Sequence, residues 1–226
     1  MDRREKIEKA IESEQPIKFR LYALLQDTED DVNFIATEIL NRYKKPELLS
    51  PVYTAIKELA LNGAKANIKR VLFKELEIDE NNPESYEEGM RTFKEKLAES
   101  FVKEYAIKAK EMGLFVDVKF DYNRHRLIIE VENNSFLSEK EDKRIRGKFA
   151  KGSTYDNIAE FYMDTMDNAE GAGLGITLIL MLIKAEGIDP HVFTIKSDFK
   201  TKTVAKLEFP LSASYKTSRE RFAEVK

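Results

Sequence analysis

The chain of 226 residues contains no cysteine, no tryptophan and only two histidines. The absence of cysteine excludes disulfide bridges and thiolate metal sites. His125 and His191 lie far apart in the sequence, in or beside expected strands, where a lone histidine usually has a structural role. Two such residues make a poor zinc site, so no resident zinc centre is expected.

Long hydrophobic runs are also missing. Residues 2–6 are all charged, and the start of the sequence lacks the apolar stretch of a signal peptide. The most apolar run, residues 174–185, is only about a dozen residues long, whereas a helix needs about 20 to span a bilayer. The sequence therefore predicts a soluble cytoplasmic protein without membrane insertion.

Neither sign of charge dominates the chain. There are 38 basic and 41 acidic residues, so the formal net charge is only −3 although 35% of the residues are charged. A nucleic-acid-binding domain normally presents a basic face, and none is indicated here. The hydrophobic content of 42% is sufficient for a core. The length fits one large domain or a domain with an appendage.

The first informative motif is residues 57–69, which read KELALNGAKANIK. At roughly 100° per residue, Glu58, Asn62 and Lys65 fall within about 60° of one another on a helix, and Lys69 joins them. A carboxylate can orient water, an amide oxygen can ligate magnesium and a lysine can hold a phosphate. The alternative is a solvated helix face that carries charges without a site.

The second motif is residues 170–178, which read EGAGLGITL and precede an apolar run of helix length. Glycines before a helix let backbone N–H groups approach an anion, and the helix dipole adds to this attraction. The pattern alone is weak, because flexible turns often produce it. It is also not the dinucleotide-binding fingerprint, since residues 155–168 before it read as helix or lid and not as a strand.

In this order, the two motifs resemble those of the GHKL ATPases. This family includes the ATP-binding domains of sensor histidine kinases, the anti-sigma-factor kinases, the gyrase-type ATPases and heat-shock chaperones. Residues 58–65 resemble the family's N-box, and residues 171–178 resemble its G2 box in the histidine-kinase form. Residues 192–211 resemble the closing hairpin. The resemblance covers roughly residues 50–212.

The resemblance implies an α+β fold, a two-layer α/β sandwich of the Bergerat type with a mixed sheet covered on one face by helices. We expect a histidine-kinase-like ATPase domain over residues 49–212. Residues 1–48 would form an N-terminal extension packed on or preceding this domain, and residues 213–226 a C-terminal tail. A long helix at about 83–112 lies outside the family pattern.

The same resemblance implies roles for individual residues. Asn62 would hold Mg²⁺, which bridges the phosphates of ATP or ADP, and Glu58 would orient the nucleophile or activate it as a base. The remaining implied phosphate-binding residues are Lys65, Gly171, Gly173, Leu174 and Gly175. Catalysis of this kind consists mostly of positioning and electrostatics.

The chain departs from the family at its Asp-x-Gly-x-Gly motif. Alternation along the strand at 126–132 aligns Asn133 with the family's aspartate, and Ser135 and Leu137 with its two glycines. The aspartate accepts a hydrogen bond from the adenine amino group. Asn133 can still accept this bond, but more weakly because it carries no charge. Ser135 and Leu137 place side chains where the family's glycines let the backbone turn tightly.

Residues 138–168 are expected to form two short helices. Ser138 and Glu141 form a capping box that opens the first of them. In the family this region leads into a lid over the nucleotide, where Lys148 and Lys151 would reach the phosphates. The alternative is that both lysines are ordinary surface residues.

The expected helix at 83–112 carries an apolar stripe at i+4 spacing. Its members are Phe93, Leu97, Phe101 and Tyr105. The stripe would brace the sheet, form the surface of a homodimer or simply pack within the chain. The other expected elements are helices at 2–14, 30–43, 175–186 and from Ser50 to about Leu76, and strands at 18–24, 114–121, 126–132, 191–198 and 202–209.

Three functions remain open. The first is an ATP-binding signalling regulator or protein kinase that acts on a separate partner. It is not a self-contained histidine autokinase, because residues 1–48 contain no histidine. The second is a GHKL-fold protein that has lost ATP turnover or binding and regulates a protein partner. The third is an unrelated α+β binding domain. The retained Glu58 and Asn62 favour the first, and the altered Asn133 motif favours the second.

Overall fold

The structure, a computed structural model, describes residues 2–165 and 174–224. The fold is α+β, as predicted. Its elements in chain order are α1 (Arg3–Glu12), β1 (Ile17–Leu21), α2 (Gln26–Arg42), the 3-10 helix η1 (Pro46–Leu48), α3 (Leu49–Glu75), α4 (Pro83–Lys96), α5 (Glu99–Glu111), β2 (Val116–Asn123), β3 (Arg126–Asn133), α6 (Glu139–Thr154), α7 (Ile158–Thr165), α8 (Leu174–Ala185), the 3-10 helix η2 (Pro190–Val192), β4 (Phe193–Ser197), β5 (Thr203–Pro210) and α9 (Ser218–Glu224).

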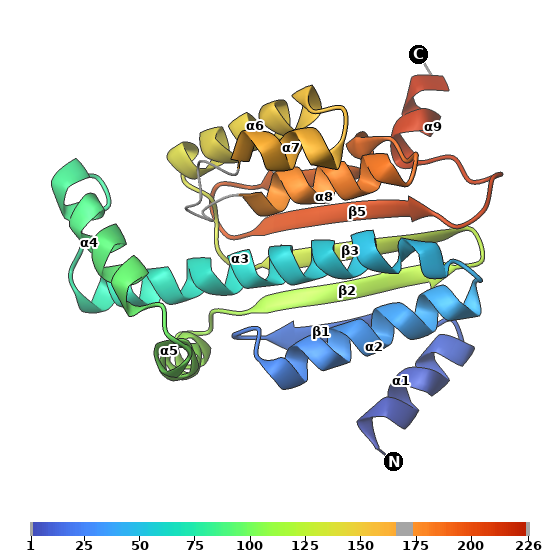
Figure 1. The fold of residues 1–226 in the computed structure, drawn as a ribbon. Helices are drawn as coiled ribbons and strands as arrows, with labels where there is room; N and C mark the ends of the chain where they lie inside the picture. Colours follow the sequence, from blue (N-terminus) through green and yellow to red (C-terminus); the bar gives the residue numbers. More distant parts are fainter. Residues whose placement is uncertain (1, 166–173, 225–226) are drawn as a thin grey trace.

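The strands form one sheet in the order β1-β2-β3-β5-β4. Helices α2, α3 and α8 lie across it on one side, which gives the two-layer sandwich that the sequence predicts (Figure 1). All four pairings are antiparallel, so the expectation of a mixed sheet is wrong. Two of these pairings, β2–β3 and β4–β5, join consecutive strands through short connections that only an antiparallel pair allows.

Strand β3 confirms the predicted register. Leu127, Ile129, Val131 and Asn133 are buried on the side that faces the helices. Glu132 points to the opposite side, where its carboxylate lies 3.4 Å from the ammonium of Lys202. The period of two along a strand therefore brings Asn133 into the interior between the two layers.

Residues 2–48 belong to the same sheet and core as the other described residues. Strand β1 pairs along its whole length with β2, and the buried side of α2 packs on α3. Asp117 on β2, which is only 1% exposed, fixes β1 by accepting hydrogen bonds from Arg20 at 2.7 and 2.9 Å and pairing with Lys18 at 2.7 Å. The N-terminal segment thus packs on the domain as its edge strand and a covering helix.

Helix α3 begins earlier than predicted. Leu49 is its first residue, one before the predicted start at Ser50, and Leu48 precedes it without a side-chain cap. The preceding turn η1 leads directly into the helix and replaces a side-chain cap. Pro51 is tolerated in the first turn, where a backbone N–H has no partner in the helix. Helix α4, in contrast, has a side-chain cap, because Asn82 accepts hydrogen bonds from the backbone N–H groups of Glu84 and Ser85.

The expected single helix at 83–112 is wrong. It breaks at Leu97 and Ala98 into α4 and α5, which lie at one end of α3 (Figure 1). Phe93 and Tyr105 are both buried in a cluster with Leu72 of α3. A straight helix touches a neighbour along one line only, whereas two helices joined at a bend bury both aromatic rings. The stripe therefore packs within the chain.

The most apolar run of the sequence forms α8. Its buried residues include Ile176, Ile179, Leu180 and Ile183, and the helix packs between α3 and α6. None of the helices that the structure describes has the length and apolar character needed to cross a membrane.

Candidate functional site

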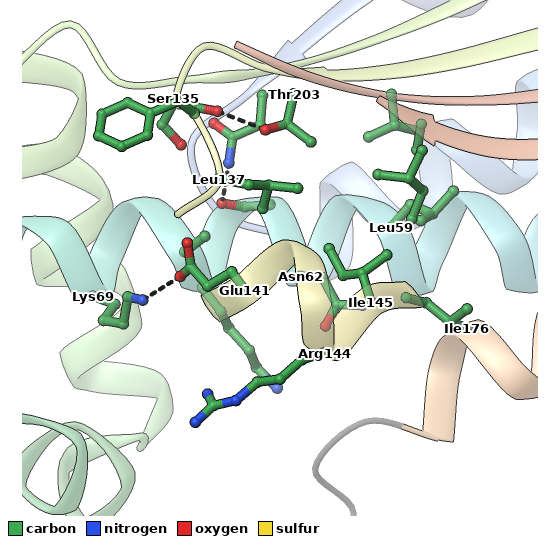
Figure 2. Close-up of a pocket in the computed structure, with 18 of the residues that line it drawn as sticks. Leu59, Asn62, Lys69, Ser135, Leu137, Glu141, Arg144, Ile145, Ile176 and Thr203 are labelled. Carbon is green, nitrogen blue, oxygen red and sulfur yellow. Dashed lines mark hydrogen bonds and ion pairs between the residues drawn. The ribbon is translucent and has the colours of Figure 1, made fainter. Parts of the chain in front are cut away.

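A hollow in two parts that share several lining residues opens between α3, α6 and the ends of the central strands. The inner part has a volume of about 360 Å³ and the outer part about 690 Å³. Asn62, Lys65, Arg144 and Lys148 line both parts. Sites for small molecules usually occupy about 300–1,000 Å³, so the hollow has room for one. Figure 2 shows the inner part, with α3 behind it and Glu141 and Arg144 of α6 in front.

Asn133 lines the inner hollow and is 9% exposed. Its Nδ2 donates to the carbonyl of Gly63 at 3.1 Å. Its Oδ1 is buried and accepts no hydrogen bond from any residue that the structure describes. Buried polar atoms are almost always paired, because an unpaired one costs about 1–3 kcal/mol. The free carbonyl oxygen is therefore a candidate acceptor for a ligand's N–H group.

The contact between Asn133 and α3 depends on a close approach of helix and sheet. At Gly63 a Cβ atom would lie 2.9 Å from Cγ2 of Val116 on β2, closer than real contacts allow. A glycine at this position lets α3 sit low on the sheet, so that the Gly63 carbonyl is within reach of Asn133. Gly63 thus lies on the side of α3 that packs against the sheet.

The turn after β3 is fixed by side chains in place of the glycines of the resembled family. Ser135 is buried and donates through Oγ to Oδ1 of Asn67 at 3.2 Å. Thr203 donates to the carbonyl of Ser135 at 2.9 Å, and the N–H of Leu137 donates to Ser197 at 3.2 Å. Ser135 and Leu137 both line the inner hollow. Hydrogen bonds to three different elements therefore hold this turn beside the cavity.

Lys69 does not face the hollow as a free cation. Its Nζ lies 2.6 Å from Oε1 of Glu141, and both side chains are largely buried (Figure 2). Glu141 also accepts from the N–H of Ser138 at 2.9 Å, which completes the predicted capping box. Burial alone would raise the pKa of Glu141, but Lys69 and Ser138 together lower it. This ion pair attaches the start of α6 to α3.

The outer hollow is positively charged. Among the described residues, Lys65, Arg144 and Lys148 have no hydrogen bond or ion pair, and no carboxylate lines this part. Burial lowers the pKa of Lys148, and the charge of Arg144 acts in the same direction. Lys94 and Lys151, the latter with a partner of its own, also line this part. Unpaired cations gathered in one cavity attract an anionic ligand.

The two sequence motifs meet at Glu58 and Gly175. A Cβ atom on Gly175, the second residue of α8, would overlap the Glu58 carboxylate. Glu58 itself does not line the hollow but lies one helical turn before Asn62. Leu174 lines the outer part. The predicted phosphate-binding residues Gly171 and Gly173 lie outside the described residues.

Replacing Gly175 with alanine tests this contact. Alanine in a helix is more stable than glycine by about 0.5–1 kcal/mol, and Gly147 in α6, which faces open space, offers the matched control. We expect Gly147→Ala to show this gain in the free energy of unfolding. Gly175→Ala should gain less, because the Glu58 side chain has to move. Urea unfolding measures both, and equal gains would show that Glu58 does not press on Gly175.

Several site residues were not predicted. Asn67 was missed, although a polar residue on the buried side of an otherwise apolar helix was a usable signal. Arg144 was missed because it belongs to a run of charged residues without a distinguishing pattern. Thr203 gave no signal, because only the pairing of β5 with β3 places it beside Asn133.

The residues present fit a Mg²⁺ ion that takes only one or two coordinating atoms from the protein and the others from a bound ligand and water. The described part of the chain has no group of three or more His, Cys, Asp or Glu side chains that would form a metal site on their own. Asn62 is exposed to the hollow and offers one amide oxygen. Mg²⁺ commonly takes one or two protein ligands and completes its shell with phosphate oxygens and water.

No protein-family model and no solved structure matches the chain. Among curated proteins, an uncharacterized protein of Treponema pallidum (strain Nichols) is 32% identical over 219 residues. The match covers 97% of this chain and 42% of that protein. The chain therefore spans about two fifths of the length of this relative, whose printed name states no activity.

Proposed function

We propose that the chain binds a magnesium nucleotide, ATP or ADP, with the base in the inner hollow and the phosphates in the outer one. The buried, unpaired Oδ1 of Asn133 carries this proposal. The adenine amino group has the N–H that this oxygen lacks. The N-box and G2-box resemblance, which associates position 133 with adenine, supports the same assignment.

The charges of the outer hollow support the placement of the phosphates. Lys65, Arg144 and Lys148 have no partner among the described residues and would neutralise a triphosphate. Asn62 would hold Mg²⁺, whose chemical contribution is further neutralisation of phosphate charge. Glu58, one turn before Asn62, would orient or deprotonate the nucleophile if the phosphate is transferred.

Thermal unfolding with nucleotide and magnesium tests the proposal. A ligand present at a hundredfold excess over its Kd stabilises the native state by about 2.7 kcal/mol, which raises Tm by several degrees. We expect this rise with ATP and magnesium, and a smaller one with ITP, whose 6-oxo group would face the oxygen of Asn133. Asn133→Leu, which keeps the side-chain size, should lose the ATP response. No rise with any nucleotide at millimolar concentration would contradict the proposal.

Within this proposal the chain acts in cytoplasmic signalling, as a regulator or protein kinase that acts on a separate protein. The support is the N-box arrangement, in which Glu58 and Asn62 are both retained. Transfer of labelled phosphate from ATP to a partner would require Glu58. Glu58→Gln should then retain nucleotide binding and lose the transfer.

A second function is favoured by Ser135 and Leu137. Their side chains are fixed beside the inner hollow, where the resembled family has glycines. A cavity altered in this way suits a regulator that binds a protein partner and does not turn ATP over. Nucleotide-dependent stabilisation without measurable hydrolysis or phosphate transfer would favour this function over a kinase.

A further inference from the structure

Three buried side-chain atoms in the described part of the chain have no hydrogen-bond partner. They are Nδ2 of Asn67, Nε of Arg70 and Oδ1 of Asn133. Unpaired buried polar atoms are rare and costly, because each has given up its bonds to water without a replacement. All three occur where α3 meets the turn after β3, so the cost is concentrated at one place. Such a concentration points to a group that binds there.

A single stripe of α3 carries two of these atoms. Gly63, Asn67 and Arg70 follow one another at spacings of four and three residues, so they lie on the same side of the helix. The stripe runs along residues 133–136, and its hydrogen bonds in order are from Asn133 to the Gly63 carbonyl, from Ser135 to Asn67 and from Arg70 to the Phe136 carbonyl. Arg70 and Asn133 also line the inner hollow, whereas Asn67 does not. Arg70 and Asn133 are therefore the two candidates for contact with a ligand.

Arg70 is held in place by Phe136. Its guanidinium lies 4.6 Å from the centre of the Phe136 ring, and Nη2 donates to the Phe136 carbonyl. Both contacts leave Nε without a hydrogen-bond partner. A guanidinium stays protonated in proteins and has no acceptor atom, so Nε can offer only an N–H donor. The hollow thus offers one fixed acceptor, on Asn133, and one fixed donor, on Arg70.

This pair of groups matches the polar edge of adenine. The amino group of adenine donates, and the ring nitrogens on either side of it, N1 and N7, accept. We propose that Arg70 recognises the base together with Asn133, with its Nε–H donating to N1 or N7 while the amino group donates to Asn133. Arg70 selects a base by its ring acceptor, which the carbonyl oxygen of Asn133 cannot do. This inference rests on the proposed function and adds a second specificity-determining residue to it.

Two ATP analogues test this contact on the unaltered protein. 1-Deaza-ATP and 7-deaza-ATP each replace one ring nitrogen by C–H and keep the amino group. With magnesium present, isothermal titration calorimetry should show that one of them binds roughly tenfold more weakly than ATP, because its C–H leaves the charged Nε–H donor unpaired. Equal affinity for all three would overturn the inference and leave the proposed function standing. No binding of any of them at millimolar concentration would overturn both.

Replacing Arg70 with methionine assigns the contact to this residue. Arg70→Met should bind ATP and the weaker analogue equally, and it should still prefer ATP to ITP, because that choice depends on Asn133. The matched control is Arg91→Met, since Arg91 is exposed on α4 and lines neither part of the hollow. This variant should discriminate between ATP and the analogue as the unaltered protein does.

Circular dichroism checks that both variants are folded. A folded Arg70→Met that keeps the full preference for ATP over the analogue would overturn the role of Arg70, because a residue that only supports the turn does not decide between two bases. The comparison of the analogues on the unaltered protein decides the inference even if Arg70→Met does not fold.

Discussion

Replacing Asn62 with alanine is expected to abolish the magnesium-dependent part of ATP binding and to leave the fold intact. Asn62 is exposed and makes no hydrogen bond to a described residue, so its removal should change the free energy of unfolding by less than about 0.5 kcal/mol. The same side chain is the only amide of the N-box stripe that lines both parts of the hollow. The rise in Tm with ATP should therefore no longer depend on magnesium.

The control for this change is Asn33→Ala. Asn33 is also an exposed asparagine inside a helix, α2, but it lies away from both parts of the hollow. This variant should respond to ATP and magnesium like the unaltered protein. If Asn62→Ala kept the full magnesium-dependent rise, the proposed role of Asn62 would be wrong even if nucleotide binding itself were confirmed.

Replacing Lys69 with methionine is expected to destabilise the protein by about 2–4 kcal/mol. This is slightly less than the roughly 3–5 kcal/mol for breaking a fully buried ion pair, because the Glu141 side chain is 21% exposed. Lys69 is 8% exposed and its partner Glu141 is also mostly covered. The change leaves the carboxylate of Glu141 without its cation at the start of α6. For a domain of this size each kcal/mol lowers Tm by about 2–4 °C, so a loss of roughly 4–16 °C should be measurable.

The loss of stability caused by Lys69→Met should be larger at neutral pH than at acidic pH. The pKa of Glu141 is lowered in the folded protein, so its contribution to stability is present above the pKa of the unfolded chain and is lost as the pH falls through the folded value. In Lys69→Met this contribution is gone, and protonation of Glu141 removes the unpaired charge. The difference between the variant and the unaltered protein should therefore be large at neutral pH and shrink at acidic pH.

Lys74→Met is the matched control for this measurement. Lys74 lies on the same helix but is exposed, and it has no ion pair within the part of the chain that is described. Its replacement should change stability by less than about 0.5 kcal/mol at any pH. An equally small effect of Lys69→Met would mean that the connection between α3 and α6 does not depend on this pair.

Local patterns in the sequence predicted the features that depend on neighbouring residues. The alternation of Leu127, Ile129 and Val131 predicted the inward direction of Asn133, which the structure confirms. The capping box of Ser138 and Glu141 likewise predicted where α6 begins. These signals succeed because a strand repeats every two residues and a cap acts within one turn.

The break between α4 and α5 had no local signal. No glycine or proline occurs between residues 90 and 112, and the apolar stripe continues at helical spacing through Leu97. The chain bends there because Phe93 and Tyr105 are both buried against α3. Packing of this kind overrides helix propensity, which amounts to less than about 1 kcal/mol per residue.

The sequence by itself determined the α+β class, the periodic faces of α3 and β3, and the residue types available for a site. The tertiary structure alone decided how those residues are paired. Lys69 meets Glu141 across 72 residues, and Ser135 meets Asn67 across 68. The same packing leaves Oδ1 of Asn133 unpaired. No local pattern encodes such contacts, because they depend on how closely α3, β3 and α6 approach one another once the core is packed.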